Sequence, residues 1–238
     1  MDKELKPFWN SFFNFNWKFG LFLILTVCIP RFVLVLNANA SGSYGSIGLV
    51  MLISAIAPFI FLSKQGRREI GITLPKKYQW LFFAVLGGLI ASFLLYFLGQ
   101  TLYENSFQNW YQYIGKSLDK SKGFAVLAII SMVFSPIGEE LFFRGIVHTS
   151  FAKSIGDKKA SIVDGSAFAL THISHFGLVF VYGKWDFFII PTIIWVISMF
   201  LVSLLFYHFR KQSGSILGAI LCHSAFNFGM TYCIFYLI

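Results

Sequence analysis

The chain has few charged residues for its length. Lys, Arg, Asp and Glu make up 12% of its 238 residues, whereas about 25% is usual in soluble domains. This shortage excludes an ordinary water-soluble surface. Cysteine is also scarce, with three residues that are widely spaced and lie within apolar segments. Three widely spaced cysteines form neither a disulfide framework nor a paired-cysteine metal motif, so we expect free thiols.

Several familiar catalytic and targeting patterns are absent as well. The sequence contains no H-E-x-x-H metalloprotease motif and no G-x-S-x-G nucleophile motif. Residues 1–18 are polar and aromatic, and no small-residue cleavage site follows the first apolar run, so no cleavable signal peptide is expected. These absences direct attention to the polar residues that lie within the apolar segments.

Long uncharged apolar runs dominate the sequence. Hydrophobic residues make up 57% of the chain, and a helix of about 20 such residues spans a bilayer. We predict an all-α polytopic membrane bundle of about seven transmembrane helices, in a single domain over residues 1–238. The predicted spans cover residues 19–36, 44–63, 80–103, 124–152, 160–182, 187–209 and 215–237. Within span 124–152, Pro136 and Gly138 predict a bend, after which Glu139 opens a new helical segment.

The basic residues are concentrated in the loops between the apolar runs, as in multi-pass membrane proteins. The formal net charge is +9, but Lys and Arg stand mainly in short loops between the apolar runs. This distribution predicts orientation in a membrane, and it does not favour binding to nucleic acid. The loops after spans 44–63, 124–152 and 187–209 are the most basic. The positive-inside rule therefore predicts a cytoplasmic N-terminus and an external C-terminus, in the cell membrane.

The segment Glu139–Arg144 places three charges inside an apolar run. An ionised side chain at bilayer depth costs about 2.5–3.5 kcal/mol on insertion-based scales, so such residues indicate a functional site. Glu140 and Arg144 stand at i and i+4 and are predicted to pair, in one stack with His148. Glu139 lies about 100° around the helix and is predicted to be the carboxylate left to act. The alternative is that Glu139 belongs to a second structural ion pair.

Two further spans carry polar residues that need partners. His172 lies near the middle of span 160–182, and His223 and Asn227 share one face of span 215–237. A single histidine in a helix is commonly a hydrogen-bonded structural residue, but a buried carboxylate nearby requires a polar neighbour. The helical rise predicts that Glu139, His172 and His223 lie about 12–20 Å in from the cytoplasmic ends, in one layer.

These residues fit two chemistries. In the first, Glu139 acts as general base on a water molecule that His172 holds. His223 and Asn227 then donate hydrogen bonds to an oxyanion. In the second, two histidines and a glutamate bind zinc, which activates the same water. Cys222 points about 100° away from His223, so a Cys/His protease is not expected.

The motifs occur in order on three separate spans, as Glu139-Glu140-x-x-x-Arg144, Phe168-x-x-x-His172 and His223-x-x-x-Asn227. Together they resemble the CPBP family, also called the Abi family. Its members are intramembrane CAAX prenyl endopeptidases and bacteriocin-processing or bacteriocin-immunity proteins. The resemblance covers Ser135–Gly229, and we expect the protease core at residues 120–238. It implies a helical membrane endopeptidase whose cavity opens to the cytosol.

The resemblance also implies a role for each catalytic motif residue. Glu139 matches the base on water and His172 the motif-two histidine. His223 and Asn227 match the residues assigned to the oxyanion hole. The family is implied to work without a catalytic metal, which favours the first chemistry and leaves zinc as the alternative cofactor.

Glu140 and Arg144 are implied to be structural or substrate-facing. The expected partners are the lipid bilayer and a peptide or membrane-protein substrate in which one peptide bond is hydrolysed. A non-catalytic bacteriocin immunity or membrane scaffold protein is the alternative, and intact motifs favour the enzyme over it. A proton-coupled transporter would share the buried Glu and His residues, but it often shows inverted repeats, and the sequence shows no repeat.

Overall fold

The computed structural model describes residues 3–43, 45–102, 129–181 and 183–237. Within these residues the chain is helical apart from one small hairpin, which confirms the predicted all-α class. A 3-10 helix, η1 (Trp9–Ser11), comes first. The long helices are α1 (Trp17–Ser41), α2 (Gly45–Phe61), α4 (Gln79–Leu102), α11 (Ile189–Ser213) and α12 (Ile216–Tyr236).

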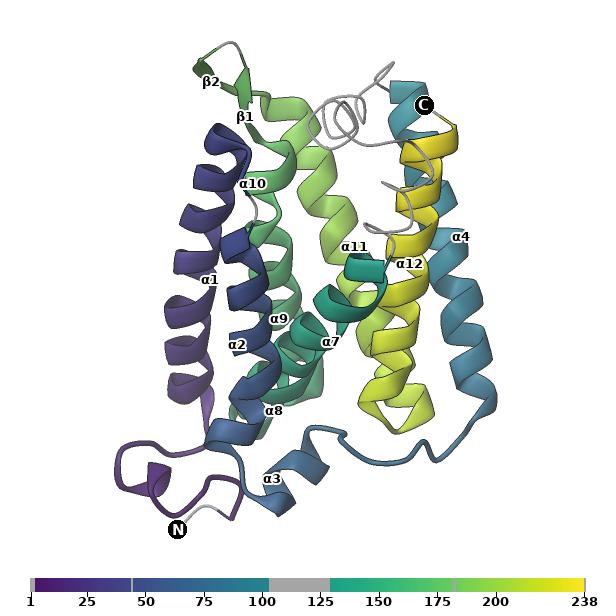
Figure 1. Cartoon of the computed structure of the whole chain (residues 1–238). Helices are drawn as coiled ribbons and strands as arrows, with labels where there is room; N and C mark the ends of the chain where they lie inside the picture. The colour runs from purple at the N-terminus through teal and green to yellow at the C-terminus, as the bar shows by residue number, and fades with distance from the viewer. Residues whose placement is uncertain (1–2, 44, 103–128, 182, 238) are drawn as a thin grey trace.

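Shorter elements connect the long helices. The helix α3 (Lys64–Glu69) follows α2. The middle of the chain runs through η2 (Ile130–Phe134), α7 (Ser135–Glu140), η3 (Leu141–Val147), α8 (His148–Ile155), α9 (Asp157–Thr171) and α10 (Ile173–Phe176). Residues 124–128 of the predicted span 124–152 lie outside the described residues. Figure 1 shows the N-terminus and α3 at one end of the bundle and the C-terminus at the other.

The surface of the bundle is apolar where a membrane would surround it. In the part of the chain that the structure describes, four helices are long and apolar enough to cross a membrane: Trp17–Ser41, Gln79–Thr101, Ile189–Ser213 and Ile216–Tyr236. Large apolar side chains face outward on them, such as Leu25 and Ile29 on α1. Charged residues are buried inside instead, among them Arg31 and Glu139. This inverted arrangement is that of a multi-pass membrane protein.

The predicted helical span 160–182 is wrong in its last part. Within this span the helical part ends with α10. The chain then forms an antiparallel hairpin of β1 (Leu178–Val181) and β2 (Lys184–Phe187) before α11 begins. Aromatic and β-branched residues favour strands. Gly183 in the turn has φ +76°, a left-handed conformation that glycine adopts without strain. A short apolar run fits a strand as well as a helix end, which is why the pattern alone misled.

Gly138 lets α7 approach α2 closely beside Glu139. A Cβ atom at position 138 would lie 2.6 Å from the carbonyl oxygen of Met51, whereas one at Gly48 would meet no described atom within 4 Å. We therefore expect Gly138→Ala to lower the free energy of unfolding by about 1–3 kcal/mol, because the two backbones must separate. Gly48→Ala is the matched control and should not be destabilising. Thermal unfolding in detergent measures both, and equal midpoints would contradict the close contact.

Candidate active site

The acidic motif lies on the run of helical segments from η2 to α8, which passes obliquely through the bundle in Figure 1. Pro136 stands in the first turn of α7, where a missing N–H leaves no intrahelical bond unmade. The new segment therefore begins at Ser135, and not at Glu139 as predicted. The wide π-helical turns of η3 follow directly, and such turns are frequent at functional sites.

Glu139 is held by an ion pair across the bundle. Arg31 on α1 donates from Nη2 to Oε1 of Glu139 at 2.9 Å, and the Ser135 hydroxyl donates to the same oxygen at 2.8 Å. Both charged side chains are buried, with 4% and 3% of their surface exposed. Glu139 therefore takes part in a second buried ion pair, which is the alternative that the sequence left open. The sequence signal was Arg31 itself, a charge within the first apolar run that needed a buried counter-charge.

This pairing uses one oxygen of the Glu139 carboxylate. The other, Oε2, is buried and has no hydrogen-bond partner among the described residues. His172 and His223 lie close enough to interact electrostatically with the carboxylate. Glu139 thus combines a fixed orientation, a compensating positive charge and an uncommitted acceptor oxygen, in a region that it shares with two histidines.

Glu140 joins two of the motif-bearing helices. Its Oε1 lies 2.7 Å from Nδ1 of His223 on α12, and its Oε2 lies 3.2 Å from Nε of Arg144. The contact with Arg144 is the i, i+4 pair that the spacing predicts, whereas the contact with His223 was not predicted. An ionised carboxylate only accepts hydrogen bonds, so Nδ1 of His223 carries a proton. Glu140 therefore fixes the orientation of the His223 ring.

Arg144 packs against aromatic rings that touch both motif histidines. Its guanidinium carbon lies 4.2 Å from the ring centroid of Phe168 and 5.3 Å from that of Phe206. Phe206 stacks on the His223 ring, with centroids 4.5 Å apart. Phe168 contacts the His172 ring, with centroids 4.4 Å apart. The cation–π contacts of Arg144 therefore help to position both histidines, each through one phenylalanine.

His172 lies at the C-terminal end of α9, where the chain turns into α10. Its Nδ1 is 2.7 Å from the carbonyl oxygen of Phe168, one turn earlier. A carbonyl oxygen can only accept, so Nδ1 carries the proton and Nε2 holds the lone pair of the neutral ring. This tautomer presents an acceptor at Nε2.

Two more polar residues were predicted to belong to these motifs, Asn227 and His148. Asn227 follows His223 by one turn on α12 and is half-buried, so the amide and the imidazole share a helix face. His148, the last member of the predicted stack, instead belongs to a separate pair. Its Nδ1 lies 2.6 Å from Oδ2 of the buried Asp164.

The structure therefore brings together five motif residues, and Asn227 follows one turn after His223 on α12. The five are Glu139, Glu140, Arg144, His172 and His223. Sequence reasoning missed Arg31 and Ser135 as partners of Glu139. In the described part of the chain, no group of three or more His, Cys, Asp or Glu side chains is placed to hold a metal ion. Cys28, Cys222 and Cys233 are buried free thiols, as predicted.

Comparison with known proteins gives one match. Residues 121–229 match the Rce1-like family, which is described as type II CAAX prenyl endopeptidase Rce1-like. No curated protein and no solved structure matched the chain. The matched segment contains all three motifs, from Glu139 to Asn227, and leaves Arg31 outside. The match to this segment, whose motifs occur in order on buried helices of a membrane bundle, supports the CPBP family of CAAX proteases for this part of the chain.

Proposed function

We propose that this protein is an intramembrane endopeptidase that hydrolyses a peptide bond in a membrane-associated peptide or protein. One observation carries the proposal. Glu139 is buried and fixed through Oε1, while its Oε2 has no hydrogen-bond partner among the described residues. This carboxylate lies in the segment that matches a protease family. A positioned carboxylate with an open acceptor oxygen is what a general base on water requires.

In the proposed reaction, Glu139 takes a proton from water through Oε2 while the water oxygen attacks the substrate carbonyl carbon. Arg31 compensates the carboxylate charge, which keeps Glu139 ionised at bilayer depth. His172 orients the water through its Nε2 lone pair. The tetrahedral intermediate then breaks at its C–N bond, and Glu139 returns the proton to the leaving amine.

His223 and Asn227 are proposed to stabilise the oxyanion of that intermediate. Glu140 holds Nδ1 of His223 at 2.7 Å, which leaves Nε2 on the opposite side of the ring. Donation to the oxyanion from Nε2 requires a ring that carries a proton on both nitrogens. Glu140 and Arg144 are thereby positioning residues.

We propose that the reaction proceeds without a catalytic metal. A zinc ion bound through the open Oε2 of Glu139 would share this carboxylate with the Arg31 guanidinium, whose Nη2 lies 2.9 Å from Oε1. Two positive charges on one carboxylate repel each other. This repulsion disfavours a zinc ion at Glu139.

Loss of Asn227 tests the proposed chemistry. Asn227→Ala should lower the turnover of a membrane peptide substrate by about 10²–10³, the usual effect of losing one oxyanion donor. The protein should remain folded, because the substitution removes no charge. Asn14→Ala, at an exposed position, is the matched control. The assay uses purified protein in detergent with and without a chelator. Unchanged turnover in Asn227→Ala, or loss of wild-type activity to the chelator with recovery on adding zinc, would overturn the mechanism.

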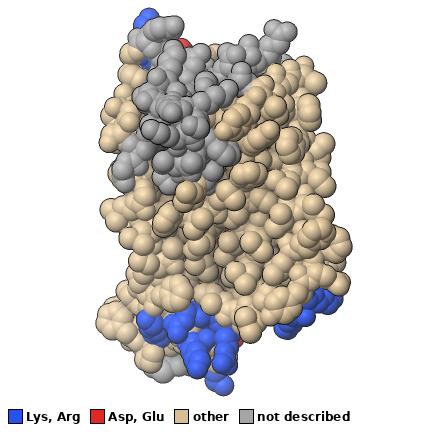
Figure 2. All heavy atoms as spheres, turned by 45° about the vertical axis from the view of Figure 1, so that its right-hand side comes forward, with Lys and Arg blue, Asp and Glu red and all other residues tan. Residues whose placement is uncertain are grey.

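We also propose about seven membrane crossings with a cytoplasmic N-terminus and an external C-terminus. In addition to the four long helices, α2, the η2–α8 run and α9–α10 would supply the other crossings. Figure 2 shows Lys and Arg gathered at the end of the molecule that carries the N-terminus in Figure 1. The positive-inside rule assigns such an end to the cytoplasm.

Reporter fusions test this topology. Fusions after residues 72 and 157 should report a cytoplasmic location, because both positions lie in the basic loops. Fusions after residue 112 and at the C-terminus should report an external one. Alkaline phosphatase and green fluorescent protein give opposite readouts at each site. A cytoplasmic C-terminus would remove one crossing and contradict the count.

A further inference from the structure

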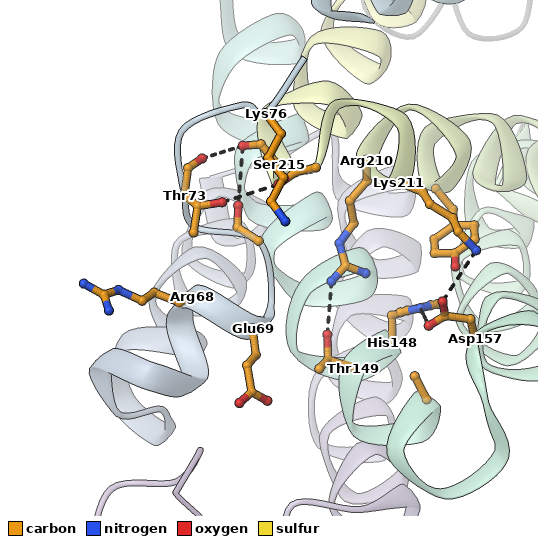
Figure 3. Close-up of a pocket in the computed structure, with 14 residues that line it drawn as sticks. Arg68, Glu69, Thr73, Lys76, His148, Thr149, Asp157, Arg210, Lys211 and Ser215 are labelled. Atoms are coloured by element: carbon orange, nitrogen blue, oxygen red, sulfur yellow. Dashed lines mark hydrogen bonds and ion pairs between the residues drawn. The ribbon is translucent and has the colours of Figure 1, made fainter. Parts of the chain in front are cut away.

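A pocket of about 550 Å³ opens at the basic end of the bundle (Figure 3). It lies between the chain after α3, the helix α8, the start of α9 and the junction of α11 with α12. None of the residues proposed for catalysis lines it. Its charged lining residues are Arg68, Glu69, Lys76, His148, Asp157, Arg210 and Lys211.

The two carboxylates of this pocket already have positive partners. Glu69 lies 3.5 Å from Lys153, and Asp157 lies 3.6 Å from both Lys211 and His148. Burial would raise the pKa of the Asp157 carboxyl, but His148 and Lys211 outweigh it and hold that pKa below its ordinary value. Both acids therefore have cationic partners of their own, although Asp157 also interacts electrostatically with Arg210.

Arg210 is the central cation of the pocket, as Figure 3 shows. Its Nη2 donates to the carbonyl oxygen of Ile70 at 3.2 Å and to the hydroxyl of Thr149 at 3.1 Å, which fixes the guanidinium plane. No carboxylate lies within 4.0 Å of Arg210 among the described residues. A guanidinium presents a planar fork of donors, which suits an anion with several oxygens.

Lys76 is a second cation without a carboxylate within 4.0 Å in the described chain. Its backbone N–H donates to the carbonyl oxygen of Ser213 at 2.8 Å. Its stem lies against Gly214, where a Cβ atom would come within 3.1 Å of the Lys76 side chain. Lys76 is thereby held beside the pocket, whereas Arg68 points away from Arg210 in Figure 3.

The pocket lies at the boundary between the apolar surface and the basic end. On α11, Ile197 and Leu201 are outward-facing apolar residues, with 54% and 59% of their surface exposed. Arg210 and Lys211 follow in the last turn of the same helix. This order places the pocket at the depth of lipid headgroups. Basic pockets between transmembrane helices at this level bind anionic headgroups.

We propose that this pocket binds the phosphate group of an anionic membrane lipid, with Arg210 and Lys76 as its ligands. Arg210 offers a fixed fork of donors, and Lys76 adds a point charge on the other side. The inference goes beyond the proposed proteolysis and does not depend on it. Soluble phosphate shares the same chemistry, and the experiment distinguishes the two sources.

The test is equilibrium binding to the full-length protein in detergent, with native mass spectrometry to count bound lipid. The probe is phosphatidylglycerol, compared with phosphatidylcholine of the same chain length and with inorganic phosphate. Lys76→Gln and Arg210→Gln should each raise the Kd for phosphatidylglycerol about fivefold, the usual contribution of one basic residue near a membrane surface. Lys77→Gln is the matched control, because Lys77 is adjacent and exposed but does not line the pocket.

The outcomes separate clearly. Selective weakening by Lys76→Gln, with Lys77→Gln unchanged, supports the proposal, even if Arg210→Gln fails to fold after losing its contacts with Ile70 and Thr149. Equal weakening by Lys77→Gln would show general surface attraction and overturn the site. Equal binding of phosphatidylcholine would do the same. Displacement of phosphatidylglycerol by millimolar inorganic phosphate would overturn the lipid as occupant and assign the pocket to soluble phosphate.

Discussion

The Glu139→Gln variant should lose peptide-bond hydrolysis while it still binds substrate. Glutamine keeps the size of the side chain but cannot take a proton, and general base catalysis contributes about 10²–10⁴ in rate. The ion pair adds a second effect. With Glu139 neutral, Arg31 is buried without a counter-charge, and breaking such a pair costs about 3–5 kcal/mol. We therefore expect this variant to be inactive and also to accumulate at a lower level.

The double variant Arg31→Gln, Glu139→Gln separates the two effects. It leaves no uncompensated charge, so the amount of folded protein should return towards wild type while hydrolysis stays absent. Membrane-fraction immunoblots and substrate cleavage measure the two quantities. Asp186→Asn on the exposed strand β2 is a matched carboxylate-to-amide control and should change neither. Wild-type cleavage by a well-expressed double variant would reject the protease mechanism and favour a non-catalytic scaffold.

The Glu140→Ala variant should lose about 3–5 kcal/mol of stability, because it leaves the fully buried Arg144 without its carboxylate. It also removes the acceptor that orients His223, so residual activity should fall as well. Thermal unfolding in detergent gives the stability change, and turnover is measured below the unfolding midpoint.

A surface carboxylate supplies the comparison for this variant. Glu69→Ala removes a partly exposed acid 3.5 Å from Lys153, and such surface pairs contribute about 0–1 kcal/mol. Its unfolding midpoint should therefore stay close to that of the wild type. A Glu140→Ala protein as stable as Glu69→Ala would contradict the structural role of the Glu140–Arg144 pair.

Relations within one helix could be predicted from the sequence. The i, i+4 rule placed Glu140 beside Arg144, and it placed His223 and Asn227 on one face, because these positions depend only on the helical repeat. Long apolar runs predicted α1, α4, α11 and α12 as membrane helices. The end of α9 and the hairpin after α10 were not predicted, because short apolar runs fit strands and helices equally.

The sequence by itself determined that the chain lies in a membrane and which charged side chains need partners inside it, since an unpaired charge in an apolar run has a high energy. Only the tertiary structure decided how those charges pair. Arg31 meets Glu139 from 108 positions away, and His223 meets Glu140 from 83 positions away. Such pairs depend on which helix faces are packed together. Local periodicity contains no information about that packing, and a buried charge is stabilised only by the counter-charge that the packing brings within reach.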